Sequence, residues 1–71
     1  MEEWGGVTED GLFYYHAKYG HLTTLVNRFP DGSFHCSYSD SKTGETLYWI
    51  KTENERYKQQ ALRYWERNNI K

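Results

Sequence analysis

The sequence is poor in three features that can each decide a fold class: cysteines, prolines and long apolar runs. It holds one cysteine, Cys36, and one proline, Pro30, among 71 residues. A single cysteine excludes an internal disulfide and favours a reducing compartment. No apolar run approaches the roughly 20 residues of a membrane span, and the acidic start MEEWGGVTED is the opposite of a secretory signal. We therefore expect a soluble, uncleaved, cytoplasmic protein that makes no membrane contact.

The length of the chain limits the interior that it can build. The sequence has no internal repeat and no low-complexity linker, so we expect a single domain over residues 1–71, with a loosely ordered N-terminal segment at residues 1–10. A core of this size rarely supplies more than about 3–5 kcal/mol of net stability. Aromatic residues make up 18% of the chain, and seven of them are tyrosines. Tyrosine suits a small interior because its ring can be buried while its hydroxyl stays in water.

Four short stretches have the composition of β-strands. They cover residues 12–19, 21–29, 33–39 and 46–51, are rich in aromatic and β-branched residues, and are separated by turn signals. This spacing predicts an antiparallel meander of three to four strands. The fourth stretch is the hardest to place because residues 47–50 are apolar on both faces. A small barrel of SH3 type, closed by this stretch, is an alternative.

The period of the apolar residues changes after Thr52 and becomes helical. The sequence TENE, at residues 52–55, is a capping box for a helix N-terminus, and we expect the helix to run from about residue 53 to residue 68. The apolar residues at helical spacing are Tyr57, Ala61, Tyr64 and Trp65. The predicted fold class is therefore α+β: a small antiparallel β-meander with one C-terminal α-helix packed on one face.

Two turns suggest a register for the first three of these strands. The sequence Pro30-Asp31-Gly32 is typical of a type I turn followed by a bulge, which puts Val26 opposite Cys36. A two-residue turn at Tyr19 and Gly20 would put Phe13 opposite Val26 and Tyr14 opposite Leu25. Both turns predict the same two faces, whereas a two-residue turn at Asp31 and Gly32 would shift the third strand by one residue. The inward face is Phe13, Tyr15, Ala17, Leu22, Thr24, Val26, Phe34, Cys36 and Tyr38. The outward face is Leu12, Tyr14, His16, Lys18, His21, Thr23, Leu25, Asn27, His35, Ser37 and Ser39.

Few residues have the context that catalysis or metal binding requires. His35 and Cys36 are adjacent in a strand, so their side chains point to opposite faces and cannot share an ion. His16 and His21 can approach each other, but two ligands do not make a zinc site. Cys36 alternates with inward residues, which predicts a core cysteine rather than a nucleophile. A chain this short also struggles to enclose a ligand pocket. We expect no enzyme, no cofactor, no metal and no small-molecule substrate.

Two surfaces remain as candidate binding sites. The first is the outward sheet face, where tyrosine is present and charge is scarce, as at protein interfaces. Its candidate residues are Tyr14, His16, Leu25, Asn27 and His35. The second is an edge of the predicted helix, where arginines spaced by seven and four residues can engage phosphates or an acidic protein. These are Arg56, Arg63 and Arg67. Ordinary solvated faces explain both patterns as well.

Two functions are compatible with these surfaces. The first is a small non-enzymatic regulator or inhibitor that binds another protein or itself as a homodimer, as do many tiny proteins of phages and mobile elements. The alternative is nucleic-acid binding through the helix arginines. A three-stranded sheet followed by a helix is similar in element order to the DNA-binding domains at the start of some phage integrases. The resemblance covers element order alone, and the net charge of −1 and the scarcity of cations on the outward face weigh against it.

Overall fold

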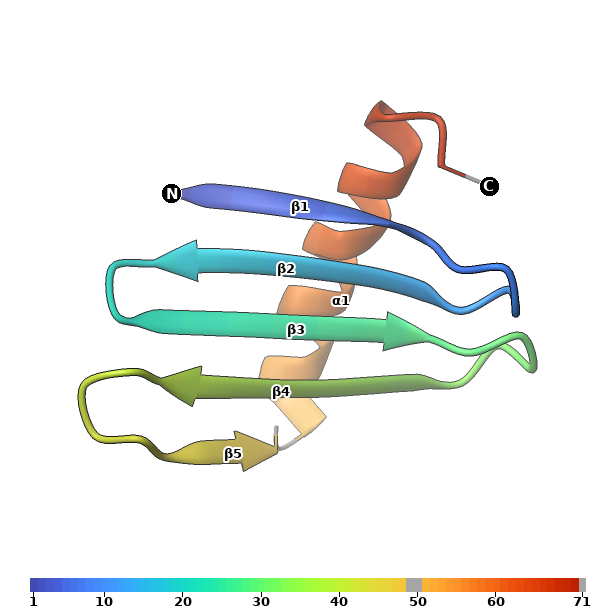
Figure 1. Cartoon of the computed structure of the whole chain (residues 1–71). Helices are drawn as coiled ribbons and strands as arrows, with labels where there is room; N and C mark the ends of the chain where they lie inside the picture. The colour runs from blue at the N-terminus through green and yellow to red at the C-terminus, as the bar shows by residue number, and fades with distance from the viewer. Residues whose placement is uncertain (49–50, 71) are drawn as a thin grey trace.

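Five antiparallel strands form one sheet, and a single helix crosses behind it (Figure 1). The structure is a computed structural model that describes residues 1–48 and 51–70. The strands are β1 (Glu2–Val7), β2 (Phe13–Tyr19), β3 (Leu22–Arg28), β4 (Phe34–Asp40) and β5 (Thr46–Tyr48), and the helix is α1 (Lys51–Arg67). Strand order in the sheet follows chain order, and α1 contacts β1 to β4. The prediction of an α+β meander with one C-terminal helix on one face is confirmed.

The N-terminal segment differs from the expectation. Residues 1–10 were expected to be loose, but Glu2–Val7 forms the edge strand β1 and pairs with β2 along its whole length. The composition of residues 2–7 does not predict a strand, because this segment contains Gly5, Gly6 and two glutamates, and both residue types are depleted in strands. Tertiary contacts supply what propensity lacks. A Cβ on Gly5 would lie 2.6 Å from the Tyr14 carbonyl oxygen and 3.0 Å from the Tyr64 ring, so glycine lets the helix approach β1 closely.

The register between β3 and β4 is the predicted one. Val26 pairs with Cys36, and Gly32 has a φ of 90° after the type I turn that Phe29 closes by accepting from the Gly32 N–H at 2.9 Å. The Asp31 carboxylate accepts hydrogen bonds from the Ser33 backbone N–H and hydroxyl, at 2.9 and 2.6 Å, which tie the turn together. These contacts also lower the pKa of Asp31.

The register between β2 and β3 was predicted wrongly by two residues. Tyr15, not Phe13, pairs with Val26, and the turn residues are Gly20 and His21. Gly20 has a φ of 61° at the first central position of this two-residue turn, where a type II′ turn needs glycine. Because the shift is an even number of residues, no side chain changes face. Within β2 to β4 the predicted inward and outward sets therefore hold although the pairing does not, while Leu12 and His21, predicted to face outward, lie outside the strands.

The core lies between the inner face of the sheet and α1. Its fully or nearly fully buried residues are Tyr15, Ala17, Val26, Cys36, Ala61 and Trp65, with Thr24 beside them. The Thr24 hydroxyl donates to the Ala17 carbonyl at 3.2 Å, so this buried polar group is satisfied. Trp65 is 2% exposed and its indole N–H donates to the Tyr14 carbonyl at 2.9 Å, which ties the helix to the middle of the sheet.

The helix ends in a Schellman motif rather than with a glycine. Asn69 takes a φ of 55°, its N–H donates to the Glu66 carbonyl at 3.2 Å, and the Ile70 N–H donates to the Trp65 carbonyl at 2.8 Å. Ile70 then packs against the core. At the other end α1 begins at Lys51; the predicted capping box rests on Thr52, whose side chain lies outside the described residues.

Candidate functional site

The outer face of the sheet is an almost uncharged surface with aromatic rings near its centre. Pairing brings Trp4, His16, Leu25 and Ser37 into one row across β1 to β4, and Gly6, Tyr14, Asn27 and His35 into the next row. The two charged positions of this face on β1 to β4, Glu2 and Lys18, are paired with each other at one end. We call Trp4, Tyr14, His16, Leu25, Asn27 and His35 the outer patch.

Three rings of the outer patch pack together, with His16 contacting both of the others. Trp4 stacks on His16 with ring centroids 4.9 Å apart and planes 6° from parallel, and Tyr14 meets His16 edge-on at 6.1 Å. Trp4 remains 41% exposed despite this stack. Tyr14 also covers Gly6, since a Cβ there would lie 3.1 Å from the Tyr14 hydroxyl oxygen. The rings thus form a pre-positioned apolar surface that still faces water.

Burial among these neighbours changes the chemistry of His16. Desolvation lowers the pKa of His16 from its ordinary value of 6.5, because the charged imidazolium is disfavoured where water is partly excluded. At neutral pH the imidazole is therefore uncharged. The centre of the outer patch carries no formal charge, which suits contact with another uncharged or apolar surface.

All five predicted outward residues lie on the outer face, although their pairing differs from the prediction. Tyr14 lies opposite Asn27, and it is His16 that lies opposite Leu25. Asn27 in turn pairs with His35, whose exposed ring contacts Phe29 at 4.6 Å. The shift of two residues brings His16 and Leu25 side by side.

Trp4 is the residue of this surface that the sequence analysis missed. It was overlooked because the first ten residues were expected to be loose. One signal was available: in Glu2-Glu3-Trp4-Gly5-Gly6-Val7 an aromatic and an aliphatic residue stand in an otherwise polar or glycine background. That pattern is too short and too weak to predict a strand without knowledge of its pairing partner.

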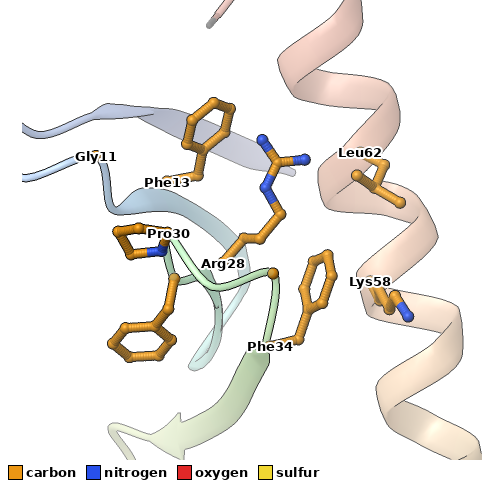
Figure 2. A pocket seen from close by; sticks show the side chains of 9 residues that line it. Gly11, Phe13, Arg28, Pro30, Phe34, Lys58 and Leu62 are labelled. Carbon is orange, nitrogen blue, oxygen red and sulfur yellow. The ribbon is translucent and has the colours of Figure 1, made fainter.

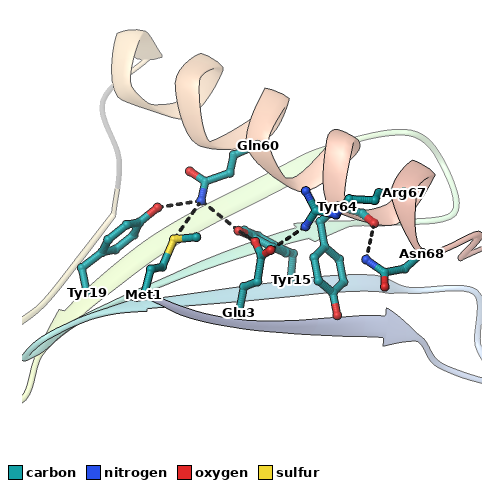
Figure 3. Close-up of polar contacts among 8 residues, drawn as sticks. All are labelled: Met1, Glu3, Tyr15, Tyr19, Gln60, Tyr64, Arg67 and Asn68. Atoms are coloured by element: carbon teal, nitrogen blue, oxygen red, sulfur yellow. Dashed lines mark hydrogen bonds and ion pairs between the residues drawn. The ribbon is translucent and has the colours of Figure 1, made fainter.

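All three predicted helix arginines are exposed, but one of them, Arg67, has a carboxylate partner within the protein. Arg67 forms an ion pair with Glu3 of β1, across the gap between helix and sheet (Figure 3). Its guanidinium also lies 5.6 Å from the Tyr64 ring centroid. Arg56 lies 5.8 Å from the ring of its neighbour Tyr57, and Arg63 is exposed. One of the three predicted residues is therefore committed to holding β1 in place.

A polar network continues from this ion pair along the inner side of β1 and β2. The Tyr15 hydroxyl donates to the second Glu3 oxygen at 2.7 Å, and Gln60 donates to the Tyr15 and Tyr19 hydroxyls at 2.9 and 2.6 Å (Figure 3). Desolvation, together with the Glu3 carboxylate, raises the pKa of Tyr15. The phenol therefore stays protonated and donates its hydrogen bond to Glu3. Because the network links β1 and β2 to α1, we interpret its role as structural.

The remaining reactive side chains are buried or dispersed. Desolvation raises the pKa of Cys36 to about 11, so the buried thiol is not ionised at neutral pH. His21 lies 3.7 Å from Asp40 at the sheet end, apart from the outer patch. Among the side chains that the structure describes, no three histidine, cysteine or acidic residues gather as a metal site would require.

Comparisons with known proteins found no relative of this chain. No family model, no curated protein and no solved structure matches it. Within residues 1–48 and 51–70, no helix has both the length and the apolar character needed to cross a membrane.

Proposed function

We propose that this chain is a small non-enzymatic protein-binding module, a regulator or inhibitor of the kind found in phages and mobile elements, and that it binds through the outer patch. One observation supports this most directly: the sheet has a helix on its inner face, whereas the Trp4–His16 stack on its outer face is left 41% exposed at Trp4. Tryptophan and tyrosine are the residues most enriched at the energetic centres of protein interfaces.

The charge of the face supports a protein partner over a polyanion. Lys18 is the one cation of the outer face on β1 to β4, and it lies opposite Glu2. A surface that binds nucleic acid needs several cations along the phosphate path. A neutral patch with aromatic rings at its centre and polar residues around it instead resembles a protein interface in composition. Self-association through the same face is one form of this function.

The first test is affinity capture from an extract of the cells that encode the protein, with Leu25→Glu as the binding variant. A buried negative charge at the centre of the patch should remove the partner that the natural chain retains. Arg63→Glu is the matched control, because it introduces the same residue on the exposed helix edge. Loss of the partner with Arg63→Glu and retention with Leu25→Glu would reject the outer patch as the binding surface.

The second test uses the purified protein alone. If the partner is a second copy, sedimentation of the natural chain should show a concentration-dependent dimer, and Leu25→Glu and Trp4→Ala should both be monomeric. Circular dichroism of each variant shows whether its fold is retained. A folded Leu25→Glu variant that keeps every association of the natural chain contradicts the proposal.

Nucleic-acid binding through the helix arginines is the alternative, with less support. Arg67 is 60% exposed but paired with Glu3, so Arg56 and Arg63 are the exposed arginines of that edge that no described carboxylate pairs with. If this function holds, DNA or RNA binding should weaken steeply with salt and disappear in the Arg56→Glu, Arg63→Glu double variant. Absence of salt-dependent binding by the natural chain rejects it.

A further inference from the structure

A second feature lies on the inner side of the sheet, opposite the outer patch, between α1 and the turn that joins β3 to β4. It is an open groove of about 580 Å³ (Figure 2). The groove residues that carry the argument are Phe13, Arg28, Pro30, Phe34, Lys58 and Leu62. Four of them are apolar and two are cations, so its walls are apolar while its charge is positive.

Arg28 is held in this groove by aromatic rings. Its guanidinium carbon lies 4.0 Å from the centroid of Phe13 and 5.5 Å from that of Trp65, and Figure 2 shows the side chain reaching from β3 toward the helix. A guanidinium whose face lies on a ring keeps its N–H donors at its edge, in the plane of the group. Among the described side chains, none forms an ion pair or hydrogen bond with Arg28. A partly buried group with five donors is thus left without an acceptor among the described residues.

Lys58 places a second cation on the helix side of the groove. Its ammonium lies 4.6 Å from the ring centroid of Phe34, which stands between the two cations in the groove wall. Among the described residues, Glu55 offers Lys58 a carboxylate 3.8 Å away, on a side chain that is 65% exposed. Such an exposed pair is weak and screened by water. The positive charge of the groove is therefore only partly balanced.

We propose that this groove binds a small organic anion, a phosphate or carboxylate attached to an apolar ring. The planar edge of Arg28 matches the two oxygens of such a group, and a bidentate guanidinium contact is the strongest hydrogen bond available to it. Phe13, Phe34 and Leu62 offer apolar contact to the ring. Lys58 adds attraction from the other side of Phe34. The anion supplies the acceptors that the described residues do not offer to Arg28.

This site goes beyond the protein-binding function, and it lies on the other side of the sheet from the outer patch. It also departs from the expectation, drawn from chain length, that no small molecule is bound. The groove is open rather than enclosed, so we expect modest affinity, with a dissociation constant of about 1 mM. Since Leu25→Glu changes the outer patch alone, that variant should bind the anion as the natural chain does.

The test is a nuclear magnetic resonance titration of the folded chain with phenyl phosphate. We expect saturable shifts at the groove residues, weaker binding of inorganic phosphate, and no saturable binding of neutral phenol. Arg28→Met should reduce the affinity for phenyl phosphate by about tenfold or more. Arg63→Met, which removes the same charge from the exposed helix edge, should keep the affinity within about twofold.

Three outcomes would overturn the proposal. The first is the absence of saturable shifts with phenyl phosphate. The second is an equal loss of affinity in Arg28→Met and Arg63→Met. The third is equal binding of phenyl phosphate and inorganic phosphate, which would mean that the aromatic rings do not contribute to binding. If Arg28→Met fails to fold, Lys58→Met replaces it, because Lys58 contacts the edge of the core rather than its centre. An unchanged affinity in that variant also rejects the site.

Discussion

The two faces of the sheet differ in how their aromatic residues are satisfied. On the inner side, Tyr15 of β2 and Trp65 of α1, which packs against this face, are 0% and 2% exposed, and each has a hydrogen bond to a neighbouring element. On the outer face, Trp4 and His16 stack on each other, with Trp4 41% exposed. The same strands supply both faces by alternation. The difference indicates that the stabilising contacts are concentrated on the side that the helix covers, whereas Trp4 on the other side stays exposed.

A pair of tryptophan variants gives the largest contrast between the faces. Trp65→Ala should cost about 3–5 kcal/mol, because it leaves a cavity in the core and removes the bond to the Tyr14 carbonyl. That equals the whole stability expected of so small a core, so the variant should be unfolded. Trp4→Ala should cost about 1 kcal/mol, since it loses one partly exposed stack.

Urea denaturation measures both variants. If Trp65→Ala is unfolded throughout, Trp65→Phe replaces it and should still cost about 1–2 kcal/mol, since the lost N–H donor leaves the Tyr14 carbonyl without this bond. A larger loss of stability for Trp4→Ala than for Trp65→Phe would contradict the difference between the two faces.

The adjacent glycines of β1 provide the next contrast. Gly5 faces inward, where a Cβ would lie 2.6 Å from the Tyr14 carbonyl oxygen, so Gly5→Ala should cost about 2–3 kcal/mol. Gly6 faces outward, where a Cβ would meet the movable end of the Tyr14 ring at 3.1 Å. Gly6→Ala should change the stability by less than about 1 kcal/mol, because alanine also restricts the unfolded chain. Thermal unfolding measures the stability of both variants. If Gly6→Ala were the more destabilising of the two, Gly6 rather than Gly5 would face inward.

The two arginines near the end of α1 give a smaller contrast. Arg67 pairs with Glu3, but its side chain is 60% exposed, so Arg67→Met should cost only about 0.5–1 kcal/mol. Arg63→Met should stay within about 0.5 kcal/mol of the natural chain. Hydrogen exchange of the β1 amides should increase in Arg67→Met and not in Arg63→Met. Equal exchange in both variants would mean that the ion pair does not hold β1.

The smallest effect that we expect is a pH dependence from the outer face. Burial lowers the pKa of His16 below 6.5 in the folded chain, so under mildly acidic conditions the unfolded chain binds more protons than the folded one. The free energy of unfolding should therefore fall as the pH falls below 6.5, until the folded imidazole is also protonated. Urea denaturation at about pH 7.5 and about pH 5 should show this contribution in the natural chain, and His16→Gln should remove it. An identical pH dependence in both proteins would contradict the burial of His16.

Local signals in the chain were enough to predict most of the elements. The sequence Pro30-Asp31-Gly32 predicted its turn and the pairing of Val26 with Cys36 correctly, because a proline, an aspartate and a glycine each restrict one backbone position. The change from a period of two to a helical period predicted α1. The faces of β2 and β3 were also predicted, although their register was wrong by two residues. In a two-residue turn that contains a single glycine, the glycine can stand at either of the two central positions. The sequence therefore did not show which pair of residues closes the turn.

The sequence alone determined the element types, the α+β class and the division of each central strand into an inner and an outer set, because these depend on residue periodicity and short-range backbone preferences. Tertiary structure decided the rest. Strand β1 exists because it pairs with β2 and because Glu3 meets Tyr15 and Arg67. The same pairing brings Trp4 onto His16, and the packing of α1 brings Lys58 near Phe34. These are contacts between residues far apart in the chain, and no local preference encodes them.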